Sequence, residues 1–168
     1  MKSPRLVLIG LDAVDGGLVR RWAGEGHLPT LAKLLASGAV APIVTPIAQH
    51  EAAHVNLITE TLGKIGEQAL AKPTFKFTNG TFSASTNFLK AAKIFEDAGV
   101  KAYQGQVTNV KDKTLLAAAA AIAGTESRHA AVIGYLLDKR TVPGATEPQG
   151  TEDEVLAIVQ PYLKVAGS

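Results

Sequence analysis

The chain of 168 residues contains no cysteine, a single tryptophan, and only 5% aromatic residues. The absence of cysteine excludes disulfides, thiolate metal sites and cysteine nucleophiles. No charge of one sign dominates, because 17 Lys and Arg face 15 Asp and Glu. Without a basic stripe interleaved with aromatics, nothing indicates nucleic-acid binding. The 46% of hydrophobic residues is enough to build the core of one modest domain.

Long hydrophobic runs are also missing. The apolar run from Leu115 to Ala123 is too short to span a bilayer and is soon followed by Glu126. The amino terminus lacks the basic region, apolar core and small-residue cleavage site of a secretory signal. We therefore expect a soluble protein without a membrane span, located in the cytoplasm.

What the chain does contain is two Glu-x-x-His tetrads, Glu51 to His54 and Glu126 to His129, and a separate Glu96 between them. All three segments carry apolar residues at helical spacing. Residues three or four apart on a helix share one face, so each acid and its imidazole point the same way. The three expected faces are Ile47, Glu51, His54, Ile58, Leu62 and Ile65; Leu89, Ala92, Glu96, Gly99 and Tyr103; and Leu115, Ala119, Ile122, Glu126, His129, Ile133 and Leu136.

Charged groups on core-facing helix seams are costly unless something neutralises them, and a shared metal ion would do so. Di-iron and di-manganese helix bundles use one Glu from each of two helices and Glu-x-x-His from each of two others. The chain supplies all of this set except one Glu. Carboxylate and imidazole ligands without thiolate favour iron or manganese, and zinc stays open.

From about residue 47 to residue 163 the chain resembles the ferritin-like domain proteins of bacteria, a group that includes desiccation-related proteins. The matching stretches include "HEAAHVNLITETLG", "LLAAAAAIAGTESRHAAVIGYLL" and "VPGATEPQGTEDEVLAIVQPYL". The resemblance implies a mainly α-helical antiparallel bundle with a long crossover at residues 71–83, and oxygen or peroxide chemistry at a dinuclear metal site. Its implied metal ligands are Glu51, His54, Glu96, Glu126 and His129. Many members of that family are exported, and the absence of a recognisable secretory signal in this chain departs from that pattern.

Residues 5–46 resemble a different family, the type I phosphodiesterases and nucleotide pyrophosphatases of the alkaline phosphatase superfamily. The carrying stretches are "RLVLIGLDAVD", "RRWAGEGHLPTLAKLLASGAV" and "PIVTPI". Leu6 to Leu11 reads as a buried strand, and Asp12 at its end matches a catalytic metal ligand of that family. Ala13 replaces the usual Gly, and the rest of that enzyme is absent.

We therefore expect a chimeric chain with a phosphatase-like segment at 1–46, a helical bundle at 47–140, and a linker with a carboxy-terminal helix at 141–168. The first bundle helix and its ligand are not recognisable, although Glu25 is a candidate for the sixth ligand. Removing one helix exposes an apolar groove. The segment from Leu28 to Ser37, or a second copy in a homodimer, would cover it.

Local signals also predict where helices begin. Thr45-Pro46 predicts the start of the helix with the first tetrad. Ser83 or Ser85 and then Asp112 are the expected caps of the next two helices, and Thr151 to Glu154 has capping-box spacing. His50 lies off the ligand seam but precedes Glu51, so a supporting role beside the metal is open.

Three functions remain open. The first is a ferritin-like metal-binding protein, with or without catalysis. The second is a metal-free helical scaffold or assembly module in which the inward carboxylates pair with the histidines and with Lys or Arg. The third is an inactive phosphodiesterase fragment retaining Asp12.

Overall fold

The computed structural model describes residues 41–138 and 144–164. The helices in these ranges are α3 (Ala41–Lys64), α4 (Ser85–Gln106), α5 (Lys113–Asp138) and α6 (Glu152–Val159), followed by the short 3-10 helix η1 (Gln160–Tyr162). No strand occurs within the described ranges, where an isolated bridge joins Phe75 to Leu163. The predicted mainly α-helical fold is confirmed. Asp12, Glu25 and the segment from Leu28 to Ser37 lie outside the described residues.

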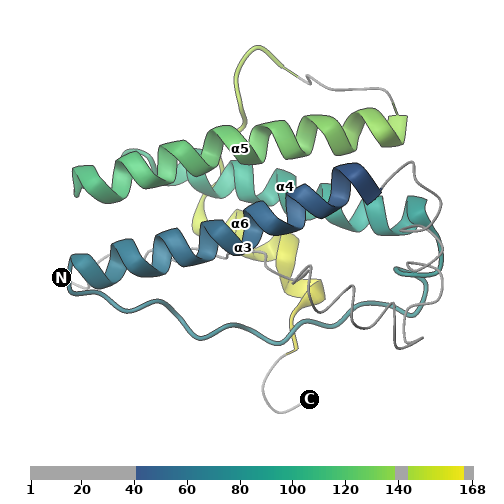
Figure 1. Cartoon of the computed structure of the whole chain (residues 1–168), viewed down its shortest axis with the longest axis horizontal. Coiled ribbons are helices and arrows are strands. Elements are labelled where there is room, and N and C mark those ends of the chain that lie inside the picture. The colour runs from purple at the N-terminus through teal and green to yellow at the C-terminus, as the bar shows by residue number, and fades with distance from the viewer. Residues whose placement is uncertain (1–40, 139–143, 165–168) are drawn as a thin grey trace.

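Helices α3 and α4 run in the same direction, and α5 returns antiparallel to both (Figure 1). The connection between α3 and α4, residues 65–84, therefore runs along the length of the bundle (Figure 1). Helix α5 packs against both α4 and α3, and its contact with α4 is the most extensive in the described parts of the chain. Within those parts α3 and α4 make no close backbone contact, so α5 is the helix that joins them.

Two apolar clusters lie at different levels of the bundle. One contains Phe88 and Leu89 of α4 with Ile133 of α5. The other contains Ile58 of α3 with Ile122 of α5 and neighbouring side chains. On α5, Glu126 and His129 fall between the two clusters, because Ile122 precedes them and Ile133 follows them by about one turn. Apolar layers thus enclose the polar residues along the bundle axis.

The carboxy-terminal part of the described chain packs against α4. Val155 and Val159 of α6 are buried with Phe95 and Ala98 of α4. The crossover joins this cluster through Phe75 and through backbone bonds in which Lys76 N donates to the Tyr162 carbonyl at 2.8 Å and Lys164 N donates to that of Thr74 at 2.9 Å. The residues of α4 that contact α6 therefore differ from those that face α5.

The helix starts agree only partly with the sequence-based predictions. Asp112 Oδ1 accepts from Leu115 N at 2.8 Å, and Thr151 forms the expected capping box with Glu154, so these two caps are confirmed. The Thr45-Pro46 start is wrong, because α3 already includes Ala41 and passes through Pro46. Proline lacks one backbone donor but does not end this helix, whose neighbouring residue Ile47 is held by packing.

The cap predicted for α4 is wrong as well. Ser85 is the first helical residue, Ala84 takes the capping position, and no side chain caps the helix. Ser83 instead donates from its hydroxyl to the Gly80 carbonyl at 2.7 Å, within the preceding turn. The prediction that Ile65 faces the bundle interior is also wrong, because Ile65 lies beyond the end of α3 and is 37% exposed.

Candidate metal centre

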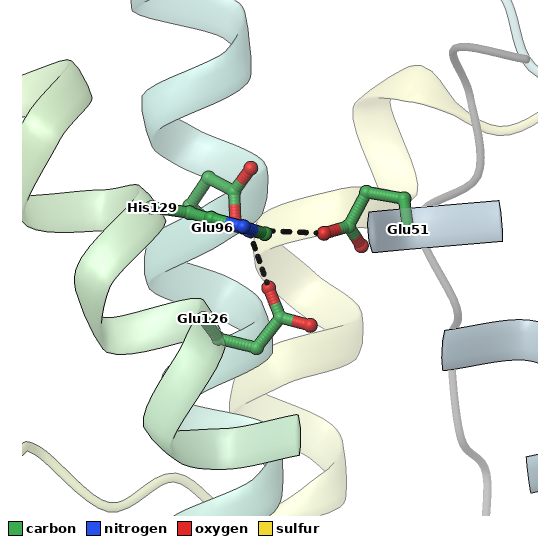
Figure 2. Close-up of side chains that lie close together, drawn as sticks. All are labelled: Glu51, Glu96, Glu126 and His129. Atoms are coloured by element: carbon green, nitrogen blue, oxygen red, sulfur yellow. Dashed lines mark ion pairs between the residues drawn. The ribbon is translucent and has the colours of Figure 1, made fainter. Parts of the chain in front are cut away.

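Five polar side chains meet in the middle of the bundle, and we call them the carboxylate–histidine centre. Helix α3 supplies two of them, α4 one and α5 two. They are Glu51, His54, Glu96, Glu126 and His129. Glu96, Glu126 and His129 are buried, although they are charged or polar residue types. Figure 2 shows Glu51, Glu96 and Glu126 turning toward the ring of His129 from three different helices.

The ring nitrogen Nδ1 of His129 is the focus of the three acids. It lies 3.1 Å from Glu51 Oε1, 3.4 Å from Glu96 Oε2 and 3.5 Å from Glu126 Oε2. One ligand atom from each of these four residues falls within 4.8 Å of every other. Two ligand atoms that each lie about 2 Å from one ion are at most about 4 Å apart, so these four atoms would have to move slightly closer together to share an ion.

His54 forms the second half of the centre. Its Nδ1 lies 2.8 Å from Glu126 Oε1 and 3.5 Å from Glu51 Oε1. The two oxygens of Glu126 therefore face different imidazoles, Oε1 toward His54 and Oε2 toward His129. Glu126 would thus offer a carboxylate oxygen beside each imidazole if a cation were bound there.

The close contacts in the centre do not form a complete hydrogen-bond network. Glu51 Oε1, His54 Nδ1 and His129 Nδ1 are buried from solvent and have no hydrogen-bond partner of acceptable geometry. These atoms nevertheless lie within 2.8 to 3.5 Å of acids or imidazoles. Buried polar atoms are normally hydrogen-bonded, so donor atoms that converge without bonding one another form an arrangement that could hold a cation.

The pKa values of two acids in the centre, Glu96 and Glu126, are shifted in opposite directions. Burial raises the pKa of Glu96 to about 8, because the charged form is poorly solvated and the acids of Glu51 and Glu126 repel it. Burial acts in the same direction on Glu126, but the imidazoles of His129 and His54 outweigh it and lower the pKa of Glu126 to about 2. Near neutral pH, Glu126 is ionised and Glu96 largely keeps its proton.

The imidazoles bind protons tightly for the same reason. Burial alone would lower the pKa of His54, but Glu126 and Glu51 raise it to about 9. For His129, the three surrounding carboxylates overcome burial and raise the pKa to about 11. The protonated imidazoles thus supply the positive charge in the centre. A metal ion would have to displace their protons before the nitrogens could bind it.

Gly99 gives the centre space on α4. A Cβ atom added to Gly99 would lie 3.9 Å from Glu126 Cγ, so the acid packs directly over the glycine backbone. On the α3 and α5 side, a groove of about 490 Å³ opens beside the centre. Its lining is mainly apolar, with Ile47 and Val132 among its residues, and it includes His50, His54 and His129.

The structure brings all five predicted ligand residues together and adds a contact that sequence reasoning left open. His50, one turn before His54 on α3, places its Nδ1 3.0 Å from His129 Nε2. Its spacing of four residues from His54 was the available signal. Among the described residues, no carboxylate beyond Glu51, Glu96 and Glu126 joins the candidate group around His129.

Comparisons with known proteins agree with this architecture. A family model described as a ferritin-like domain matches residues 21–139, which is well over half of the chain. The match includes residues 21–46, which we had placed in the phosphatase-like segment, and the phosphodiesterase resemblance itself stays a prediction. No curated protein matches the chain significantly. In the described part of the chain, no helix combines the length and apolar character needed to cross a membrane.

Proposed function

The chain belongs to the ferritin-like domain family, and we propose that its carboxylate–histidine centre binds iron or manganese. The observation that carries this proposal is the set of buried atoms Glu51 Oε1, His54 Nδ1 and His129 Nδ1, which converge without hydrogen-bonding one another. Hard carboxylate oxygens with imidazole nitrogens suit these two metals, and zinc serves as the comparison metal.

The two halves of the centre would differ in affinity. Around His129 the described residues offer an imidazole and three carboxylates within 4.8 Å of one another. Around His54 they offer one imidazole, one close oxygen of Glu126 and a more distant oxygen of Glu51. We therefore expect one ion to bind tightly beside His129 and a second to bind more weakly beside His54.

If two iron or manganese ions bind, such a centre supplies oxygen or peroxide chemistry. The residues of this chain would supply the charges that hold the ions, fix the positions of the ligands and control which molecules reach the centre. The apolar clusters on both sides of the centre exclude water along the bundle axis. The groove between α3 and α5 reaches His54 and His129 from the side, which would admit a small oxidant or a hydrated cation.

Metal analysis tests the proposal directly. The full chain is produced with iron, manganese or zinc supplied in turn, and bound metal is measured after removal of free ions. We expect at least one iron or manganese ion per chain and a higher melting temperature than in chelator-treated protein, because a ligand of the native state stabilises it. His129→Ala should abolish the tight site, whereas Glu60→Ala, an exposed acid on α3, should not.

The metal-free scaffold is the competing proposal, and the 2.8 Å contact between His54 and Glu126 supports it, because an ion pair can hold α3 to α5 without metal. Near-zero iron, manganese and zinc in every preparation, with no thermal shift on adding metal, would favour the scaffold. The predicted homodimer is tested on the same samples by light scattering, where the mass of a single chain would reject it.

A further inference from the structure

We propose that His50 is a positioning residue for the metal centre, a role that rests on the metal binding proposed above. Its Nδ1 lies 3.0 Å from Nε2 of His129. By accepting a hydrogen bond there, His50 holds the ring of His129 with Nδ1 toward the three carboxylates. The role is to orient a ligand, not to bind the ion.

The ring geometry identifies this contact as a hydrogen bond in the plane of both rings. The His50 and His129 rings are almost parallel, at 4°, and their centroids are 5.2 Å apart. That separation is close to the largest that an N···N distance of 3.0 Å permits, because it nearly equals this distance plus one ring radius on each side. The rings therefore meet edge to edge, with nitrogen facing nitrogen, and do not stack face to face.

The direction of the bond follows from what surrounds His129. Its Nδ1 is enclosed by oxygens of Glu51, Glu96 and Glu126. In a positively charged imidazolium ring both nitrogens carry a hydrogen, and in a neutral ring whose Nδ1 binds a cation the hydrogen is on Nε2. His129 is therefore the donor in both states, and His50 must accept through Nδ1. Fixing the second nitrogen of a ligand histidine in this way orients the ring and keeps the metal-binding nitrogen available.

The helix geometry explains why His50 can do this without becoming a ligand. His50 and His54 are four residues apart on α3, so both project toward α5. Their contacts differ, because His54 presents Nδ1 to Glu126, whereas His50 meets the far nitrogen of His129. His50 is exposed and lines the groove, and its contact with His129 lies at the opposite ring nitrogen from the carboxylates.

The test compares metal affinity with the stability of the metal-free protein. His50→Ala should weaken Mn²⁺ and Co²⁺ binding, measured by competition with a chelator, by about 10- to 100-fold. His50→Asn should restore most of this loss, because the Asn side-chain oxygen can occupy the place of the imidazole Nδ1. The melting temperature of the metal-free variants should stay close to that of the parent. Gln49→Ala, a change of the exposed neighbour on α3, is the matched control.

A second readout follows the ligand geometry itself. The visible absorption of bound Co²⁺ should change in His50→Ala and return toward the parent spectrum in His50→Asn. If His50→Ala keeps the metal affinity and the spectrum of the parent, the inference is overturned and metal binding stands. The inference is also overturned if His50→Asn binds metal as weakly as His50→Ala. A parent protein that binds neither Mn²⁺ nor Co²⁺ would instead reject the proposed function together with the inference.

Discussion

Glu126 Oε1 lies 2.8 Å from His54 Nδ1, and this contact connects α5 to α3. A second contact runs in the opposite sense, from Glu51 of α3 to His129 of α5, at 3.1 Å. The two helices that carry the Glu-x-x-His tetrads therefore exchange acid and imidazole across their interface. The same four side chains that would hold a metal also hold the helices together without it.

Replacing Glu126 by Gln should weaken the metal-free protein. The change keeps the shape of the side chain but removes the charge that faces His54 and His129. At pH 6, where Glu126 is ionised and His54 protonated, we expect a loss of about 1–3 kcal/mol of unfolding free energy, because the change leaves buried imidazole nitrogens without their ion-pair partner. Urea denaturation measures the loss, and Glu60→Gln should change it by less than about 0.5 kcal/mol. Equal stabilities of the two variants would contradict the importance of the contact.

The metal-free protein should lose stability at alkaline pH. The pKa of His54 is raised from 6.5 to about 9, and that of His129 to about 11. Their stabilising contributions are complete below pH 6.5 and are lost as the pH rises through these folded-state values. Glu126, whose pKa is lowered from 4.5 to about 2, stabilises above pH 4.5 and stops doing so as the pH falls through about 2.

We therefore expect the unfolding free energy of chelator-treated protein to be greatest near pH 4.5 to 6.5 and to decline toward pH 9. Thermal or urea unfolding over this range measures the decline. A free energy that is constant or rises between pH 6.5 and pH 9 would contradict the protonated imidazoles of the metal-free centre.

Metal affinity should change with pH in the opposite sense. Binding requires neutral His54 and His129 and an ionised Glu96, so each ion displaces protons from the centre. Affinity for Mn²⁺ should therefore rise between pH 6 and pH 8, and calorimetry in buffers of different ionisation enthalpy should detect released protons. An affinity independent of pH would place the bound ion away from these residues.

Glu96→Gln should change stability in opposite directions with and without metal. Burial raises the pKa of Glu96 from 4.5 to about 8, so this group destabilises the folded state progressively as the pH rises through that range. At pH 8.5 the metal-free variant should be more stable than the parent, since an unfavourable buried charge is absent. With saturating Mn²⁺ the variant should be the less stable protein, because one ligand is lost. Melting temperatures with and without metal provide the comparison.

Gly105 and Gly150 test the packing outside the centre. A Cβ at Gly105 would stand 1.8 Å from the Gly150 carbonyl oxygen, and Gly150 N donates to the Lys101 carbonyl at 3.2 Å. Gly105→Ala should thus destabilise by about 1–3 kcal/mol by displacing the chain before α6. Gly124→Ala is the control, since its Cβ would meet only the end of Arg128 at 4.0 Å. It should instead stabilise α5 by up to about 1 kcal/mol, and a similar effect of both changes would exclude the clash.

Helical spacing was sufficient to predict the bundle and the inward direction of its acids. On α5, the alternation of three and four residues placed Ile122, Glu126, His129 and Ile133 on one face, and all four are buried. The start of α3 was not predictable in this way, because Pro46 is a strong local signal that the surrounding helix overrides. The prediction that Ser83 caps α4 was wrong for a similar reason, because the Ser83 hydroxyl donates to the Gly80 carbonyl in the preceding turn.

The sequence by itself determined which face of each helix carries the acids and imidazoles, because that depends only on the number of residues per turn. The tertiary structure decided which atoms face each other: the two oxygens of Glu126 each face a different imidazole, and His50 Nδ1 faces His129 Nε2. It also decided how far burial shifts the pKa values of these groups. These depend on the rotation and approach of separate helices, which packing fixes and local spacing does not encode.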